Sequence, residues 1–279
     1  MTAGEAAASG AAFLSGVSGT AALDAQVLLA WLLGTTRAAL HAHPEQALDP
    51  ALEERYQAVL HSRRAGVCVA YLTGYKEFRR LSLRVTPDVL VPRPDTETLV
   101  EAALEYVEAA RGGGGALSVL DVCTGSGAVA LALKDEAPDL HVHASDVSAA
   151  ALAIARENAR ALALEVRFIH SDLFQHIDAR YHIITANPPY VPAAQLPTLA
   201  PEVRREPRLA LDGGADGLDV ARSLIAGAPA HLEVGGALLL ELSPPQMPAA
   251  ASLLERAGFS GVRVFPGLDG NARVVGAVR

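Results

Sequence analysis

A polar amide and two prolines come directly after a short strand-forming run in the second half of the chain. The run Tyr181–Ala186 is rich in β-branched and aromatic residues, which favour a strand. The residues that follow it are Asn187, Pro188, Pro189 and Tyr190. Proline fixes φ and keeps the preceding residue out of the helical region, so this loop is extended and stiff. A stiff loop at the carboxyl end of a strand is where open α/β sheets bind their ligands.

The loop offers the acceptors that a planar amino group needs. The Asn187 side-chain carbonyl and the Pro188 backbone carbonyl can each accept one N–H bond, and the Tyr190 ring can pack on a flat π-system. We predict catalytic roles for Asn187, Pro188 and Tyr190, and substrate contacts from these residues and Pro189. The alternative is a strand exit stiffened by prolines, which is the better interpretation of an isolated Asn-Pro pair. The glycine turn described next favours a binding site.

This glycine turn lies between a predicted strand at 117–122 and a helix rich in Ala and Leu. Glycines allow a tight turn and let a ligand approach main-chain N–H groups at a helix N-terminus. The third glycine of the dinucleotide fingerprint is replaced by Ala130, a permitted variant. The residues predicted to contact a cofactor here are Asp121, Cys123, Thr124, Gly125, Ser126 and Gly127.

Two more predicted strands also end in polar residues. The strand at 140–145 ends at Asp146, whose carboxylate can accept both ribose hydroxyls of an adenosine. The strand at 166–170 is followed by Asp172 and Leu173, and Asp172 can accept an adenine amino group. We add Asn187 to this cofactor set. A site for adenosine without a pyrophosphate, beside a loop that holds an amino group, indicates S-adenosylmethionine; a dehydrogenase would leave the Asn187 loop without a role.

The first part of the chain favours a small helical domain. Residues 1–20 predict at best a weak, frayed helix, whereas Leu23, Val27 and Trp31 recur every four residues before a stop at Gly34. A second helix is expected to begin at Asp49, with Pro50 in its first turn. Its predicted apolar stripe consists of Leu52, Tyr56, Val59 and Leu60.

The helical part is followed by a change of pattern. A strand is expected at 81–85, a loop fixed by prolines at 91–97, a helix at 99–110 and a flexible glycine run at 111–115. We therefore predict a helical substrate-recognition domain at 1–85, a linker segment and helix at 86–115, and a methyltransferase domain at 116–279.

Composition limits the class of protein. The chain has 279 residues, of which 51% are hydrophobic, but its apolar runs are shorter than the roughly 20 residues of a membrane span. The start lacks a basic segment, and the two cysteines, Cys68 and Cys123, cannot form a disulfide framework. The net charge of −8 argues against a protein that binds nucleic acid through its phosphates. We expect a cytoplasmic monomer that does not bind membranes.

Other candidate residues have weaker patterns. The pairs His41/His43 and His141/His143 lack the further ligands of a zinc site, so no metal is predicted. Cys123 has no base nearby in the sequence pattern and is interpreted as a small packing residue. Two interpretations stay open for Arg204, Arg205 and Arg208, namely surface charges or contacts with a partner, and likewise for the N-terminal helices, which either recognise a substrate or pack as a cap.

The chain resembles the release factor glutamine methyltransferases. The resemblance rests on Ala70–Gly74 with Glu77 and Phe78, on Val91–Glu97, on Asp121–Gly127, on Asn187–Tyr190, and on Glu206–Leu211 with the glycines at 213, 214 and 217. The Asn-Pro-Pro-Tyr motif is shared with DNA amino-methyltransferases, whereas the Pro-Arg-Pro-Asp-Thr-Glu block and the helical N-terminus are more specific. The chain departs from the family pattern at Ser243, where a glycine is common, and at Ala272, which separates Asn271 from Arg273.

This resemblance implies the fold and the reaction. The fold would be α/β: a Rossmann-like class I methyltransferase domain, with a mostly parallel seven-stranded sheet and a C-terminal antiparallel hairpin, preceded by a small α-helical bundle. The reaction would be N5-methylation of the glutamine in the Gly-Gly-Gln motif of peptide chain release factors, which supports translation termination. S-adenosyl-L-methionine would be the donor and S-adenosyl-L-homocysteine the product. Methylation of ribosomal-protein glutamines, a DNA or RNA amino-methyltransferase, and a non-catalytic S-adenosylmethionine-binding protein remain as alternatives.

Overall fold

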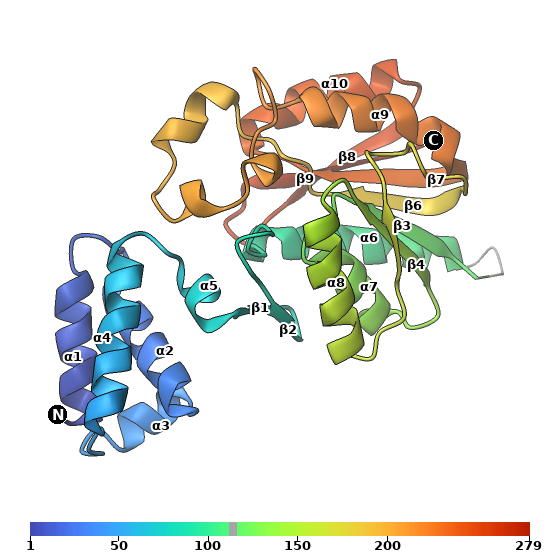
Figure 1. Ribbon diagram of the computed structural model, residues 1–279. Helices are drawn as coiled ribbons and strands as arrows, with labels where there is room; N and C mark the ends of the chain where they lie inside the picture. The colour runs from blue at the N-terminus through green and yellow to red at the C-terminus, as the bar shows by residue number, and fades with distance from the viewer. Residues whose placement is uncertain (112–115) are drawn as a thin grey trace. The chain divides into compact units, whose positions relative to one another are not determined.

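A computed structural model describes residues 1–111 and 116–279 of the chain (Figure 1). The glycine run at 112–115, predicted to be flexible, lies outside the described residues. The described chain divides into two compact units. One consists of Met1–Tyr75 with Ala200–Arg205, and the other of Lys76–Leu199 with Glu206–Arg279. We call them the helical unit and the sheet unit.

The helical unit contains five helices: α1 (Ala3–Leu14), α2 (Ala21–Leu33), α3 (Arg37–Ala42), α4 (Pro50–Arg64) and α5 (Val69–Thr73). Its core lies among α1, α2 and α4, where Leu14, Leu28 and Leu60 are fully buried. The predicted start of α4 is confirmed, because the Asp49 side chain accepts the Leu52 N–H at 2.8 Å.

Two expectations for the first helices were wrong. The segment at 1–20 forms the well-capped helix α1, because Thr2 and Glu5 make a reciprocal capping box. In α2 the predicted stripe points outward, since Leu23 and Trp31 are each 41% exposed. The buried face carries Leu28 instead. Nearly every position of α2 is apolar, so a four-residue spacing could not identify the face that packs.

The sheet unit begins with a two-stranded sheet, β1 (Tyr75–Phe78) and β2 (Leu81–Arg84), and a 3₁₀ turn at Pro94–Thr96. A seven-stranded sheet follows in the order β5-β4-β3-β6-β7-β9-β8. The pairings from β5 to β7 are parallel, and β9 and β8 add antiparallel pairings. The predicted fold, including the C-terminal hairpin, is confirmed. The strands of this sheet are β3 (Ser118–Val122), β4 (His141–Asp146), β5 (Arg167–His170), β6 (Tyr181–Ala186), β7 (Leu232–Glu241), β8 (Ser260–Pro266) and β9 (Ala272–Val278).

Helices cover both faces of this sheet (Figure 1). Val119 and Ile183 point to the face covered by α6 and α7, and their neighbours Leu120 and Ile184 point to the face covered by α9 and α10. Both faces of the central strands are therefore buried, which explains why they are mostly apolar and do not alternate with polar residues. The helices of this unit are α6 (Glu97–Ala110), α7 (Ala128–Glu136), α8 (Ala149–Ala161), α9 (Asp219–His231) and α10 (Met247–Arg256).

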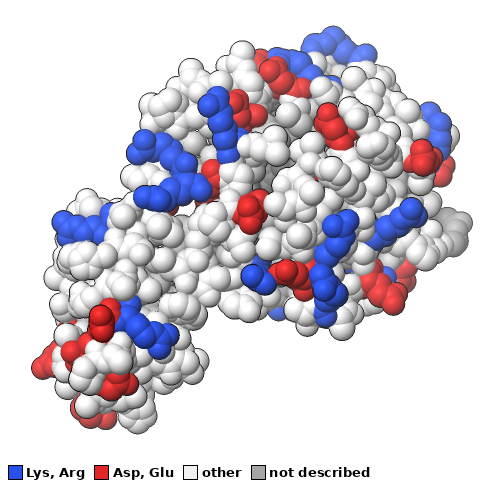
Figure 2. Space-filling view, in the orientation of Figure 1, with Lys and Arg blue, Asp and Glu red and all other residues white. Residues whose placement is uncertain are grey.

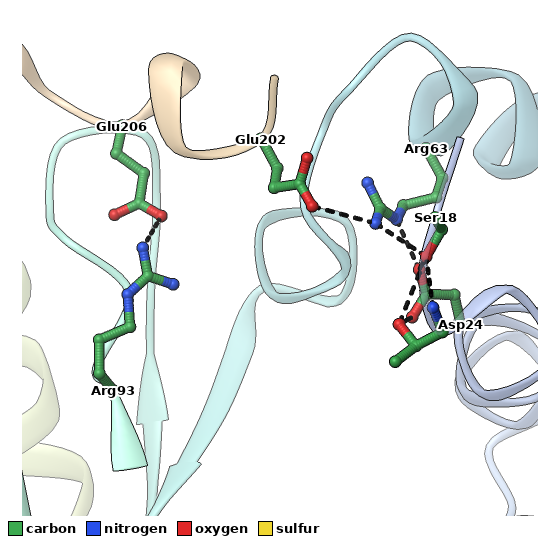
Figure 3. Close-up of polar contacts among 7 residues, drawn as sticks. Ser18, Asp24, Arg63, Arg93, Glu202 and Glu206 are labelled. Atoms are coloured by element: carbon green, nitrogen blue, oxygen red, sulfur yellow. Dashed lines mark hydrogen bonds and ion pairs between the residues drawn. The ribbon is translucent and has the colours of Figure 1, made fainter. Parts of the chain in front are cut away.

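Charged contacts hold a segment in each unit (Figure 3). In the helical unit, Arg63 donates to Asp24 at 2.7 Å, and the nearby Glu202 carboxylate lies 3.6 Å from Arg63. In the sheet unit, Arg93 pairs with the buried Glu206, which joins two blocks on which the family resemblance rests. The first segment of the helical unit ends at Tyr75, earlier in the sequence than the predicted boundary at 85. The roles assigned to 1–85, 86–115 and 116–279 stay predictions.

None of the helices in the described ranges has the length and apolar character to cross a membrane.

Candidate active site

The carboxyl ends of the parallel strands meet at one edge of the sheet. The register pairs Val122 of β3 with Ser145 of β4 and with Ala186 of β6. The residues that follow these three strands are therefore neighbours in space. A cavity of about 530 Å³ lies at this edge, within the range of small-molecule sites.

Most of the predicted site residues line this cavity. Those at its wall are Asp121, Cys123, Thr124, Gly125, Ser126, Asp146, Asp172, Leu173, Asn187 and Pro189. Gly127, Pro188 and Tyr190 are not part of the wall formed by the described residues. Gly127 contributes as the left-handed N-cap residue directly before α7, with φ of 85°. The substrate roles of Pro188 and Tyr190 stay predictions.

Asp121 stabilises the glycine turn through hydrogen bonds to two threonine hydroxyls. It is 1% exposed and accepts the hydroxyls of Thr124 at 2.6 Å and Thr185 at 2.8 Å. Thr185 is its register partner on β6, so the contact follows from the strand pairing. Burial raises the pKa of Asp121 to about 7, and the two hydroxyls oppose this rise. The carboxylate thus ties the turn to the strand that carries Asn187.

Asp146 stabilises the glycine turn by accepting hydrogen bonds from two backbone N–H groups. Its Oδ2 accepts the Gly125 N–H and its Oδ1 accepts the Ser148 N–H, each at 2.8 Å. A carboxylate has about four acceptor positions, so two remain for hydroxyls of a ligand. Burial raises the pKa of Asp146, and the hydrogen bonds from Ser148 and Gly125 oppose that rise. Its contacts and its place in the cavity wall fit a ribose site.

Two non-glycine residues at the cavity adopt left-handed backbone conformations. Cys123 has φ of 60° and Leu173 has φ of 47°. Such conformations cost free energy and gather at functional sites, where the surrounding structure holds them. Burial raises the pKa of the Cys123 thiol, as do Asp146, Asp121 and Asp172, so it stays protonated. This fits the predicted packing role, because a nucleophilic cysteine needs a lowered pKa.

Asn187 is held through the nitrogen of its amide. Its Nδ2 donates to the Thr96 hydroxyl at 3.2 Å, and Thr96 is 4% exposed. Thr96 also lines the cavity. It belongs to the block at 91–97 that marks the resemblance, yet its role at the site was not predicted from the sequence. The contact joins positions that are distant in the chain, and only the fold brings them together.

The backbone of the loop after Asn187 packs closely against the glycines at 213 and 217. A Cβ at Gly217 would lie 2.1 Å from the Tyr190 carbonyl oxygen, and one at Gly213 would lie 2.7 Å from that of Pro189. The Gln246 amide donates to the Tyr190 carbonyl at 2.9 Å. Gln246 also closes a capping box with Ser243, so the departure from the family pattern at this position begins the turn that places Gln246.

Charged groups lie behind Tyr190. Burial raises the pKa of its hydroxyl to about 12, so Tyr190 does not act as a base near neutral pH. Arg273 pairs with Asp95 at 3.2 Å and with Asp269 at 2.9 Å. The second departure from the family pattern, at Ala272, therefore leaves the arginine of that motif in contact with the 91–97 block.

Several cavity residues were not predicted from the sequence. They come from the loop before the 3₁₀ turn, from the segment after Glu206, and from the start of α9: Asp88, Val89, Leu90, Pro92, Pro207, Leu209, Ala210, Asp219, Val220 and Ser223. Pro207, Leu209 and Ala210 belong to a block that carries the resemblance, which could have marked them. The side chain of Asn158 was also missed, and it supports the turn by donating to the Ser126 carbonyl at 2.9 Å.

Comparison with known proteins identifies the family. The chain matches the PrmC N-terminal domain model over residues 5–74 and the methyltransferase small domain model over residues 103–203. It is 42% identical to the release factor glutamine methyltransferase of Moorella thermoacetica, over 92% of this chain and 91% of the relative. The chain belongs to the release factor glutamine methyltransferase family. The family's counterpart in Cereibacter sphaeroides is 45% identical over the same shares of the two chains.

Solved structures agree on the fold of the family. The 16S rRNA N2 G1207 methyltransferase of T. thermophilus, solved with AdoMet and guanosine, superposes with a TM-score of 0.54. It is 22% identical, over 74% of this chain and 49% of that one. A methyltransferase from Pyrococcus furiosus gives a TM-score of 0.53 at 18% identity, over 81% of this chain and 98% of that one. At such identities the likeness concerns the fold alone.

Proposed function

We propose that this protein transfers a methyl group from S-adenosylmethionine to the side-chain amide nitrogen of the glutamine in the Gly-Gly-Gln motif of peptide chain release factors. The observation that carries the proposal is the position of Asn187. It lies in the wall of the same cavity as Asp146 and the glycine turn, so an amide acceptor and an adenosine site share one space. Membership of the release factor glutamine methyltransferase family supports the choice of substrate.

The cavity residues fit S-adenosylmethionine. Asp146 keeps free acceptor positions for ribose hydroxyls, and Gly125 lets the backbone come close to a ligand. Asp172 and Leu173 supply the wall expected to face the adenine. When bound, the cofactor supplies an electrophilic methyl group on a sulfonium.

The protein's part in the reaction is orientation. An amide nitrogen is a weak nucleophile because its lone pair is delocalised into the carbonyl. The Asn187 Oδ1 and the Pro188 carbonyl would accept the two N–H groups of the substrate amide and hold its nitrogen for in-line attack. Orientation of reactants contributes about 7 kcal/mol or more in good cases. The same oxygens stabilise positive charge that grows on nitrogen, and one N–H proton leaves after the methyl group has been transferred, so no strong base is required beforehand.

Two substitutions separate the proposed roles. Asn187→Ala should leave cofactor affinity within about threefold and lower the single-turnover rate by more than about tenfold, because the lost contact acts in the transition state. Asp146→Ala should weaken cofactor binding by roughly 2 kcal/mol, since it removes charged acceptors. Calorimetry with S-adenosylmethionine and transfer of labelled methyl to purified release factor measure the two effects.

The substrate is tested in the same assay. Labelled methyl should appear on the Gly-Gly-Gln glutamine when the protein is offered release factors, ribosomal proteins and DNA together, with mass spectrometry locating the modified residue. Label on ribosomal proteins or on DNA, with none on release factor, contradicts the proposal. On the face in Figure 2, Lys and Arg side chains lie among Asp and Glu side chains, which agrees with a protein substrate.

A further inference from the structure

A buried polar pair lies behind Asn187, on the side of its amide nitrogen. Thr96 ends the 3₁₀ turn at Pro94–Thr96, and Glu241 ends β7. The register pairs Ala186 of β6 with Leu240 of β7, so Asn187 and Glu241 are the next residues on neighbouring strands. Thr96 is 4% exposed and Glu241 is 2% exposed. The fold therefore places a hydroxyl and a carboxyl group beside the Asn187 amide.

When Glu241 is ionised, its carboxylate can only accept hydrogen bonds, so any donor must be a neighbouring group. Glu241 can therefore interact favourably with the Thr96 hydroxyl and the Asn187 amide only through their hydrogens, and both groups lower its pKa. The Thr96 oxygen, in turn, accepts from Asn187 Nδ2 at 3.2 Å. One hydrogen of the Asn187 amide thus has the Thr96 oxygen as its acceptor, and the Glu241 carboxylate is the acceptor nearest in the register for the other, which would leave Oδ1 for the cavity.

This direction matters because the shape of an asparagine does not determine which end of its amide faces a ligand. Rotation of the amide by half a turn exchanges an oxygen for an NH2 group of nearly the same size. In the rotated form, Asn187 would direct N–H groups at the N–H groups of a substrate amide. Packing alone tolerates both forms, so the hydrogen-bond partners of the amide decide between them.

We propose that Glu241 and Thr96 are positioning residues that hold the Asn187 amide with its Oδ1 toward the cavity. This inference rests on the proposed function, in which that oxygen accepts an N–H of the substrate glutamine. Glu241 acts through its charge and Thr96 through a hydroxyl that accepts from Asn187 and donates to Glu241. Thr96 lines the described cavity wall and Glu241 does not, and both are proposed to act through the Asn187 amide.

Burial of the Glu241 carboxyl group has a desolvation cost. Its Oε2 has no hydrogen-bond partner among the described residues. Burial raises the pKa of Glu241 to about 7, Asp95 adds to this rise, and Thr96, Arg273 and Asn187 oppose it. An apolar residue would avoid the desolvation of a buried carboxylate. A buried acid kept at such a site indicates a functional role.

The test uses three conservative substitutions in the full-length protein, of which Thr96→Val and Glu241→Gln keep the size of the side chain. Thr96→Val removes the hydroxyl, Glu241→Gln replaces the obligate acceptor by an amide that can also donate, and Thr96→Ser keeps the hydroxyl. We expect Thr96→Val and Glu241→Gln to lower kcat on release factor by about tenfold or more, with S-adenosylmethionine affinity within about threefold of the wild type. Thr96→Ser should restore kcat to within about threefold. Thr98→Val, the same change at a buried threonine outside the described cavity wall, is the matched control.

A second measurement reports the orientation without activity. In protein labelled with ¹⁵N at asparagine side chains, both Asn187 amide hydrogens should exchange slowly with solvent. Exchange should quicken in Thr96→Val and Glu241→Gln but stay slow in Thr98→Val. Fast exchange in the wild type, or wild-type kcat in both Thr96→Val and Glu241→Gln, overturns the inference. If the wild type does not methylate release factor but the two amide hydrogens are protected, the proposed function fails while the orientation of Asn187 stands.

Discussion

Three carboxyl groups lie in or next to the site: Asp121 and Glu241 are buried, and Asp146 is half-buried. Burial raises the pKa of Asp121, Asp146 and Glu241. In each case hydrogen bonds from neighbouring residues lower the pKa and oppose this rise. Asp146 was predicted from the sequence because it ends a strand after a glycine turn. Glu241 also ends a strand, but its contact with Asn187 depends on which strands are neighbours in the sheet. Sequence order does not state that β6 lies beside β7 with this register, so only the structure could assign Glu241.

The raised pKa of Glu241 predicts a pH-dependent stability. The group has a pKa of about 7 in the folded protein, against 4.5 for an unperturbed glutamate. Between these values the folded state binds more protons than the unfolded state, so the free energy of unfolding falls as pH rises. The contribution is fully present below the unfolded pKa and is lost as pH rises through about 7. Glu241→Gln removes the titration, so its stability should fall less than that of the wild type between about pH 5 and about pH 8.

Denaturant unfolding at these two pH values measures the effect. Asp269→Asn is the control, because hydrogen bonds from Asn271 and a contact with Arg273 lower the pKa of Asp269 to about 2, outside this window. Its change in stability between the two pH values should match the wild type. Equal losses in the wild type and in Glu241→Gln would mean that Glu241 is already ionised throughout the range.

At the scale of elements, the site depends on loops that are held by contacts with other irregular segments, not by the strands themselves. Periodic patterns predicted the parallel strands, and β6 has the predicted bounds of Tyr181–Ala186. They did not predict the backbone contacts that hold the Asn187 loop, such as the Val191 N–H donating to the Leu211 carbonyl at 2.9 Å. Such contacts join irregular segments and leave no period in the sequence. Patterns also failed in α1, where a capping box outweighed the weak composition of the helix.

Substitution of Gly217 tests whether these contacts hold the Asn187 loop in place. A Cβ there would lie 2.1 Å from the Tyr190 carbonyl oxygen, and the residue has φ of +78°. Gly217→Ala must therefore displace the loop, and we expect lower thermal stability and loss of methyl transfer. Gly235→Ala is a matched control, because Gly235 has φ of +79° but a Cβ added there would meet nothing within 4 Å.

The two glycine variants share the cost of a left-handed alanine, about 1 kcal/mol or more. Only Gly217→Ala adds the collision with Tyr190. Thermal unfolding and single-turnover assays with saturating cofactor should show the larger loss in Gly217→Ala. Equal losses in both variants would indicate that the loop moves aside without consequence.

At the scale of the whole molecule, the helical unit has no part in the cavity wall, whose described residues all belong to the sheet unit. The sequence left two interpretations of this unit open, a recognition surface or a packing cap. A glutamine in a tight Gly-Gly-Gln turn offers little surface, so affinity for a folded substrate must come from remote contacts. This reasoning favours recognition, and it makes the helical unit the part whose loss should act on KM.

We therefore expect a variant that lacks residues 1–75 to bind S-adenosylmethionine as the full chain does, yet to methylate intact release factor with a strongly raised KM. The kcat should change less, because the cavity residues remain. Cofactor affinity by calorimetry is measured first, since removal of the helices exposes apolar surface and could unfold the rest. Short glutamine peptides should be poor substrates of both forms. A KM equal to that of the full chain would reduce the helical unit to a cap.

The truncation has a second effect that needs its own control. Residues 200–205 belong to the helical unit, where Glu202 lies 3.6 Å from Arg63 and Arg205 donates to the Ala65 carbonyl at 2.6 Å. Removing residues 1–75 frees this segment, so a raised KM could come from its disorder. In the full chain, the double substitution Glu202→Ala and Arg205→Ala removes these two side-chain contacts and keeps every helix. If recognition lies on the helices, this variant should retain most of the affinity for release factor; if it reproduces the whole rise in KM, the segment carries the recognition and the helices only hold it.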